Sequence, residues 1–95
     1  MNTIATLLGA DSGPELIIAA AAHLTMVNGQ ERLSRKDLAD EMKSATSFYK
    51  ATFLNNLSAY LDRLVKSDRL RLVAPNTYAL TAAERQALNA KLAQG

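Results

Sequence analysis

Two short β-prone segments most constrain what this chain can fold into. Leu70-Arg71-Leu72-Val73 and Thr77-Tyr78-Ala79-Leu80 contain strand-forming residues, and Ala74-Pro75-Asn76 between them has turn chemistry, so we predict a two-stranded hairpin. An isolated hairpin is not stable in water, so it must pack against the rest of the chain, whose patterned segments are helical. The 95 residues suit one small domain. The expected fold is therefore mainly α with a short β-hairpin, an α+β fold.

Three helices are expected before the hairpin. The first begins near Pro14, which suits a first helical turn, and ends at Asn28-Gly29, which tolerate positive φ. The second begins at Ser34, where Ser34-Arg35-Lys36-Asp37 resembles a capping box with Asp in place of Glu or Gln. The third is longer, continues to about Lys66 and carries one apolar stripe at helical spacing. That stripe consists of Phe53, Leu57, Tyr60, Leu61 and Leu64.

A fourth helix is expected after the hairpin, because Thr81-Ala82-Ala83-Glu84 matches a full capping box. Leu88 and Leu92 mark its apolar edge. The one clear break in the chain is Asp11-Ser12-Gly13-Pro14. It separates a short N-terminal arm, residues 1–13, from a main domain of residues 14–95.

The composition argues against an enzyme. The absence of Cys excludes a thiolate zinc site and a Cys nucleophile, and the single His makes a Ser-His-Asp triad improbable. The sequence has no Gly-rich phosphate loop and no nucleophile elbow. Asp37 could pair with Asp40 or Glu41 on one helical face, but a solvated acidic face is far more common. We therefore expect no catalytic residue, no metal, no cofactor and no small-molecule substrate.

No segment predicts a membrane protein. The apolar run of residues 16–22 has seven residues and is followed by His23, whereas a membrane span needs about 20 apolar residues. Residues 1–10 have no basic region of the kind that precedes a secretory signal core. We expect a soluble, cytoplasmic protein with no membrane partner.

The formal net charge of +2 conceals an uneven distribution. Residues 1–42 hold three basic and six acidic side chains, whereas residues 43–71 hold six basic and two acidic ones. Residues 72–95 hold two basic and one acidic. The basic excess therefore lies in one central stretch, which is either a solvated helix face or a surface for an anionic partner.

The order of elements resembles a winged helix-turn-helix domain. LSRKDLADEMK (residues 33–43) looks like the first helix of the helix-turn-helix, and LSAYLDRLVKSDRL (residues 57–70) like the end of a recognition helix entering the first wing strand. NTYALTAAER (residues 76–85) looks like the second wing strand and the next helix. The resemblance covers roughly residues 14–92. The stretch before Leu57 is longer than the family pattern needs, so either the third helix is extended or the turn around residues 45–49 is enlarged.

The resemblance implies that the third helix enters the major groove of double-stranded DNA, as in a transcriptional regulator or accessory factor. Asn can read adenine, and Lys or Arg can read guanine or hold phosphate. The candidates for base contact are Tyr49, Lys50, Thr52, Asn55 and Asn56. The candidates for phosphate contact are Ser34, Arg35, Lys36, Lys43, Arg63, Lys66, Arg69 and Arg71. Local alternatives stay open, since the two Asn could bond within the helix and Tyr49 could cover the core edge.

A protein-interaction module is the alternative function. The turn Ala74-Pro75-Asn76 has no Lys or Arg, whereas DNA-binding wings often carry basic residues, and the second helix is acidic. The Ala-rich first helix and the apolar residues Ile4, Leu7 and Leu8 could close the core or form a homodimer. A homodimer is compatible with either function, because it would also present two DNA half-sites.

Overall fold

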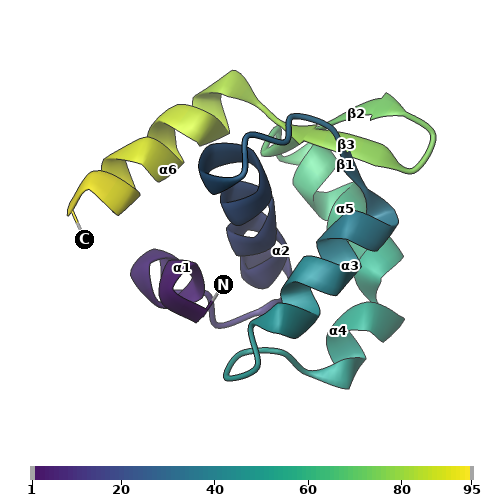
Figure 1. Cartoon of the computed structure of the whole chain (residues 1–95). Helices are drawn as coiled ribbons and strands as arrows, with labels where there is room; N and C mark the ends of the chain where they lie inside the picture. Colours follow the sequence, from purple (N-terminus) through teal and green to yellow (C-terminus); the bar gives the residue numbers. More distant parts are fainter. Residues whose placement is uncertain (1, 95) are drawn as a thin grey trace.

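The computed structural model of the chain describes residues 2–94, which form a mainly helical fold with one small antiparallel sheet (Figure 1). The expected α+β class is confirmed. Its helices are α1 (Asn2–Leu8), α2 (Gly13–Ala22), the π-helix η1 (His23–Val27), α3 (Arg35–Ser44), α4 (Ala51–Asn55), α5 (Leu57–Lys66) and α6 (Ala82–Gln94). Its strands are β1 (Leu33–Ser34), β2 (Leu70–Ala74) and β3 (Thr77–Leu80).

Helix α2 lies at the centre of the molecule, with α1 and α6 on one side and α3 and α5 on the other (Figure 1). Residues 16–22 are all buried, and the small side chains of residues 19–22 let the neighbouring helices approach closely. Among the described residues, the largest fully buried side chains belong to this helix or to the same core cluster. They are Leu16, Ile17, Ile18, Leu33, Leu38, Met42, Leu61, Leu64 and Leu70.

The ends of the first predicted helix are confirmed. Ser12 is the N-cap of α2, and its Oγ accepts a hydrogen bond from the backbone N–H of Glu15 at 3.4 Å. The helical path continues through η1 and stops before Gly29, which has a φ of 74°. The π-helical geometry of η1 was not predicted, because apolar spacing alone does not distinguish it from an α-helix.

The capping box of the second predicted helix is also confirmed. Ser34 Oγ accepts from the Asp37 N–H at 3.0 Å, and Asp37 Oδ2 accepts from the Ser34 N–H at 3.0 Å. The Ser34 N–H bond is the main reason that the pKa of Asp37 is lowered. Asp37 therefore closes the capping box in place of the usual Glu, and this box fixes the start of α3 at Arg35.

The predicted hairpin is part of a three-stranded sheet with the order β1-β3-β2. β2 and β3 pair antiparallel as predicted, with Leu70 opposite Leu80, and Asn76 in the turn has a φ of 54°. The expectation of only two strands was wrong, because β1 adds Leu33 opposite Tyr78. A two-residue strand shows no alternation in sequence, and here it pairs with β3 at Leu33, whose side chain is fully buried.

The extra residues before Leu57 form both an enlarged turn and additional helix, the two alternatives that the sequence left open. Residues 45–50 form an enlarged turn, and α4 then provides a short additional helix. The prediction of a single continuous third helix was wrong, because the helical geometry is interrupted at Asn56, where φ is −108° and ψ is 13°. The Asn56 side chain donates to the Thr52 carbonyl at 3.0 Å, and such competition with the backbone makes Asn a poor helix former.

Only half of the capping box predicted for the last helix forms. Thr81 Oγ1 accepts from the Glu84 N–H at 3.2 Å, so the N-cap itself is present. The Glu84 carboxylate does not return to Thr81, because it accepts a hydrogen bond from Arg69 Nε at 2.6 Å. The Thr81 N–H instead donates to the Arg69 carbonyl at 3.4 Å. The charged hydrogen bond from Arg69 thus replaces the local bond that the Glu84 carboxylate would have accepted from the Thr81 N–H.

Residues of the predicted N-terminal arm form α1, which packs against α2 and α6 through the fully buried Ala5. In the part of the chain that the structure describes, no helix is both long enough and apolar enough to cross a bilayer.

Candidate nucleic-acid interface

The exposed surface of α4 and α5 is the polar face that helical spacing predicts. Leu57, Leu61 and Leu64 point into the core, at 3% exposure or less. The opposite side of the two helices is solvent-exposed and mostly polar. It consists of Ala51, Thr52, Asn55, Asn56, Ser58, Ala59, Asp62, Arg63 and Lys66.

The predicted base-contact residues fall into two groups. Lys50, Thr52, Asn55 and Asn56 are exposed, whereas Tyr49 is half-buried and packs against the core. Asn56 already uses its amide N–H on the Thr52 carbonyl. Asn55 therefore has the freest amide in this group, since no hydrogen bond from its side chain is found among the described residues.

The N-terminus of α3 lies beside α5 and the hairpin turn. Arg35 Nη1 donates to Ser58 Oγ at 2.6 Å, and the Arg35 N–H donates to the Asn76 carbonyl at 2.9 Å. These two bonds bring one predicted phosphate-contact residue, the polar face of α5 and the hairpin turn into one region. Ser58 was not singled out in the sequence, although its helical phase relative to Asn55 indicated the same face.

Six of the predicted DNA-contact cations are exposed and carry no carboxylate partner within 4 Å among residues 2–94; five of them were predicted to contact phosphate, and Lys50 was predicted to contact a base. Their charges are therefore available to a ligand, because a cation without an ion pair keeps its full charge toward solvent. They are Lys36, Lys43, Lys50, Arg63, Lys66 and Arg71.

Arg69 has a different environment. Its guanidinium donates to Glu15 Oε1 at 2.8 Å and to Glu84 Oε2 at 2.6 Å, and joins α2 to α6. The Arg69 hydrogen bond lowers the pKa of Glu15, and the Glu15 carboxylate in turn raises the pKa of Arg69. Since two carboxylates neutralise Arg69, we leave it out of the candidate interface. Ser34 likewise uses its hydroxyl oxygen in the α3 cap.

Three acidic residues, Asp40, Glu41 and Asp62, lie on the same helices as the exposed cations and can reduce the positive potential of α3 and α5. Glu41 turns away to His23, with Oε1 at 2.6 Å from Nδ1; this is a close contact without hydrogen-bond geometry at Nδ1. Asp40 is exposed on α3. Asp62 lies on the exposed face of α5 and lines the same shallow hollow of about 580 Å³ as Arg63 and Lys66. The basic surface that Arg63 and Lys66 form on α5 is therefore interrupted by the negative charge of Asp62.

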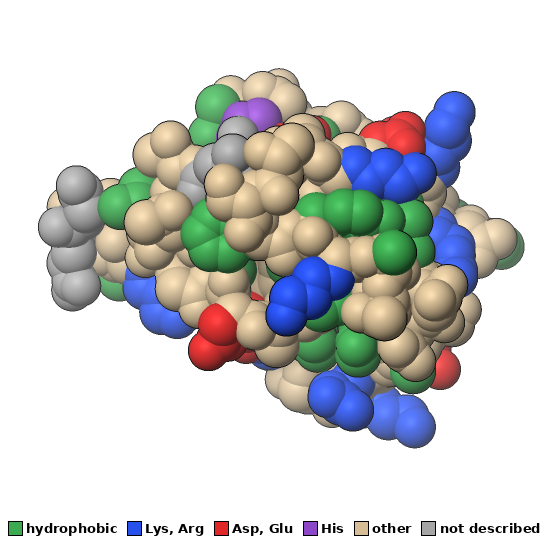
Figure 2. All heavy atoms as spheres, turned by 90° about the horizontal axis from the view of Figure 1, so that it is seen from below, with side chains coloured by type: hydrophobic (Ala, Val, Ile, Leu, Met, Phe, Trp, Pro, Cys, Tyr) green, Lys and Arg blue, Asp and Glu red, His purple; other side chains and the backbone are tan. Residues whose placement is uncertain are grey.

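Apolar groups accompany the charges at the end of the molecule that carries α1 and α4. Figure 2 shows hydrophobic side chains near the middle of this view, with Lys and Arg side chains around them. A hollow of about 220 Å³ lies between the α1–α2 connection and α4, and Leu16, Phe48, Lys50 and Phe53 are among its lining residues.

Within the described residues, no group of three or more His, Cys, Asp or Glu side chains is arranged to hold a metal ion. Comparisons with protein-family models, curated proteins and solved structures found no match to this chain.

Proposed function

We propose that the chain is a small winged helix-turn-helix module that binds double-stranded DNA and is not an enzyme. Helices α4 and α5 together act as the recognition helix. The observation that carries this proposal is that the exposed Asn55 is flanked along the chain by exposed, unpaired cations, Lys50 before it and Arg63 and Lys66 after it. Neutral amides suit base edges and unpaired cations suit phosphates.

The arrangement of the elements supports the proposal. The α3 N-terminus, the polar face of α5 and the hairpin turn meet at Arg35, which bonds to both Ser58 and Asn76. In a winged helix-turn-helix domain the hairpin is the wing, and it follows the recognition helix as β2 and β3 follow α5. The turn has no Lys or Arg, so we assign the phosphate contacts to α3, α4 and α5.

The first test is a titration of the purified chain against random-sequence duplex DNA at about 50 mM and about 200 mM salt. Binding in the micromolar range that weakens steeply at the higher salt concentration is expected. An absence of binding at low salt contradicts the proposal.

Replacing Lys50, Arg63 and Lys66 with Gln is expected to weaken binding to every DNA sequence. Each cation removed from a phosphate should reduce the steepness of log K against log salt concentration by about 0.9, or about 2.7 for the triple variant. The control is Lys91→Gln on α6, which removes a charge elsewhere on the molecule. A decrease of about 0.9 in the control, equal to the average change per charge in the triple variant, would mean that net charge, rather than this surface, governs binding.

Asn55→Ala is expected to weaken binding to a selected preferred sequence by about 1–3 kcal/mol and to leave random-sequence binding almost unchanged. The reason is that an Asn amide can bond both N6 and N7 of adenine. The comparison variant is Ser44→Ala, an exposed polar position at the end of α3. If Asn55→Ala binds both DNAs with wild-type affinity, Asn55 does not read a base.

A protein-binding role is the second candidate, because Asp62 interrupts the basic face and Leu72 of β2 is 55% exposed beside an uncharged turn. An exposed Leu on a strand suits an apolar contact with a partner protein or with a second copy of the chain. A negative DNA titration distinguishes this role from the first, and sedimentation of the free chain then shows whether the partner is a second copy.

A further inference from the structure

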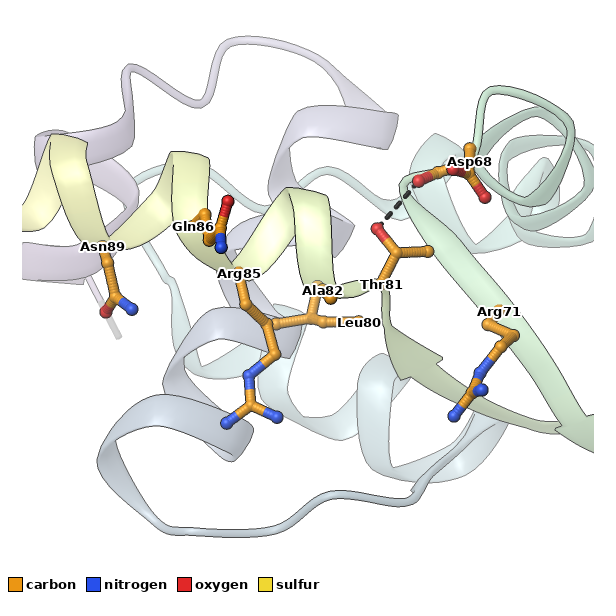
Figure 3. A pocket seen from close by; sticks show the side chains of 8 residues that line it. All are labelled: Asp68, Arg71, Leu80, Thr81, Ala82, Arg85, Gln86 and Asn89. Carbon is orange, nitrogen blue, oxygen red and sulfur yellow. Dashed lines mark hydrogen bonds between the residues drawn. The ribbon is translucent and has the colours of Figure 1, made fainter.

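A third hollow lies away from α4, between the exposed face of α6 and strand β2, with a volume of about 610 Å³ (Figure 3). Arg71 projects from β2 and Arg85 from α6, and both side chains point toward the bottom of the view in Figure 3. Two guanidinium groups that line one hollow create a local positive potential, which favours an anion.

Neither arginine is neutralised within the described part of the molecule. Arg71 has no carboxylate within 4 Å, and Arg85 has only Glu31 at 3.9 Å. The Arg85 and Glu31 side chains are 46% and 79% exposed, and an exposed pair at this distance contributes little. This distinguishes both residues from Arg69, which two carboxylates hold.

The remaining walls of the hollow combine polar side chains with the apolar Leu80 and Ala82. Gln86 and Asn89 of α6 line it with neutral amides, and Thr81 places the first turn of α6 at its edge. Amide N–H groups and the positive end of a helix both favour negative charge. Asp68 is the one acidic lining residue, and its carbonyl oxygen accepts the Thr81 hydroxyl bond at 2.8 Å.

We propose that this hollow binds a phosphate group, with Arg71 and Arg85 as its two cationic contacts. Guanidinium groups match phosphate oxygens in charge and in their fork geometry. The phosphate can come from a small phosphorylated molecule or from the backbone of bound DNA. The second source rests on the proposed function and extends the DNA surface from α5 to α6, whereas the first is independent of it.

The first arm of the test is an NMR titration of the wild-type chain with inorganic phosphate, at constant ionic strength maintained with chloride. Saturable shifts at Arg71, Thr81 and Arg85 are expected. Arg71→Gln and Arg85→Gln should each weaken binding about tenfold, whereas Lys91→Gln on the same helix as Arg85 should leave it unchanged. No localised shift up to about 50 mM phosphate, or equal weakening in Lys91→Gln, overturns the proposal.

Asp68→Asn provides a variant with the opposite expectation. Asp68 has a φ of 63°, a conformation that Asn adopts readily, so this variant should fold normally. Removing the single negative charge from the wall should strengthen phosphate binding by about two- to fivefold. Weaker binding in this folded variant contradicts the assignment of the hollow as a phosphate site.

The second arm measures duplex DNA binding by the same variants. If the source is the DNA backbone, Arg85→Gln should reduce the steepness of the salt dependence by about 0.9 relative to Lys91→Gln. If the source is a small molecule, Arg85→Gln binds DNA like the wild type while its phosphate binding is weakened. A chain that binds phosphate but no DNA refutes the proposed function and leaves this inference intact.

Discussion

Gly13→Ala is expected to destabilise the fold by about 2–3 kcal/mol, although alanine ordinarily favours a helix over glycine by about 1 kcal/mol. Gly13 is buried at the first turn of α2, directly beneath the ring of Tyr60. A Cβ at this position would overlap that ring, with Tyr60 Cζ at 2.7 Å. Displacing the half-buried ring would also disturb its edge-on contact with Phe53, at 6.5 Å between centroids.

Chemical denaturation of the single and double variants measures this effect. In a Tyr60→Ala background the overlap is absent, so Gly13→Ala should become neutral or slightly stabilising, with a coupling of about 2 kcal/mol. Gly9→Ala serves as the control. Gly9 has a φ of 64° and nothing near its Cβ position, so its cost of about 1 kcal/mol should persist in either background. Equal cost of Gly13→Ala in both backgrounds would show that the ring does not limit this site.

Arg69→Met is expected to destabilise the fold by about 2 kcal/mol. Arg69 connects Glu15 of α2 with Glu84 of α6, and the Glu84 side chain is only 12% exposed. Without the guanidinium, two partly buried carboxylates face each other across the space that it occupied. Methionine keeps most of the side-chain volume, so the measured change in unfolding free energy reports mainly the missing charge.

The pH dependence of stability identifies the cause. The folded-state pKa of Glu15 is lowered mainly by the Arg69 hydrogen bond, so its stabilisation is present above the unfolded-state pKa of about 4.3 and is lost as the pH falls through the folded-state value. Stability of the wild type should therefore decrease below about pH 5, and this decrease should be smaller in Arg69→Met. Asp37, whose pKa is also lowered, leaves a residual acid dependence in both proteins.

The exposed pair Arg85–Glu31 is the matched control for this network. Its atoms lie 3.9 Å apart and its side chains are 46% and 79% exposed. Glu31→Gln should change the free energy of unfolding by less than about 0.5 kcal/mol. A comparable destabilisation in Glu31→Gln and Arg69→Met would contradict the role assigned to burial at Arg69.

The sequence by itself determined the features that depend on a few neighbouring residues. The caps at Ser34 and Thr81, the turn at residues 74–76 and the apolar stripe of α5 all follow from local hydrogen bonding and helical spacing. The same spacing indicated the exposed side of α4 and α5 correctly, because burying Leu57, Leu61 and Leu64 leaves the opposite residues in solvent. A break at Asn56 had a local signal in its low helix propensity, but propensity is too weak to place it.

Only the tertiary structure decided what residues far apart in the chain do together. In the sequence Arg69 is one more cation in a basic stretch, yet it is neutralised by Glu15, which is 54 positions away. The same contact draws Glu84 away from the cap that its sequence predicts. β1 forms only because Leu33 meets Tyr78, and Arg71 and Arg85 share a hollow only because the first turns of α6 lie near β2 in the folded chain. Local patterns carry no information on such pairings, because their energy comes from burial and charge between elements that meet only in the folded chain.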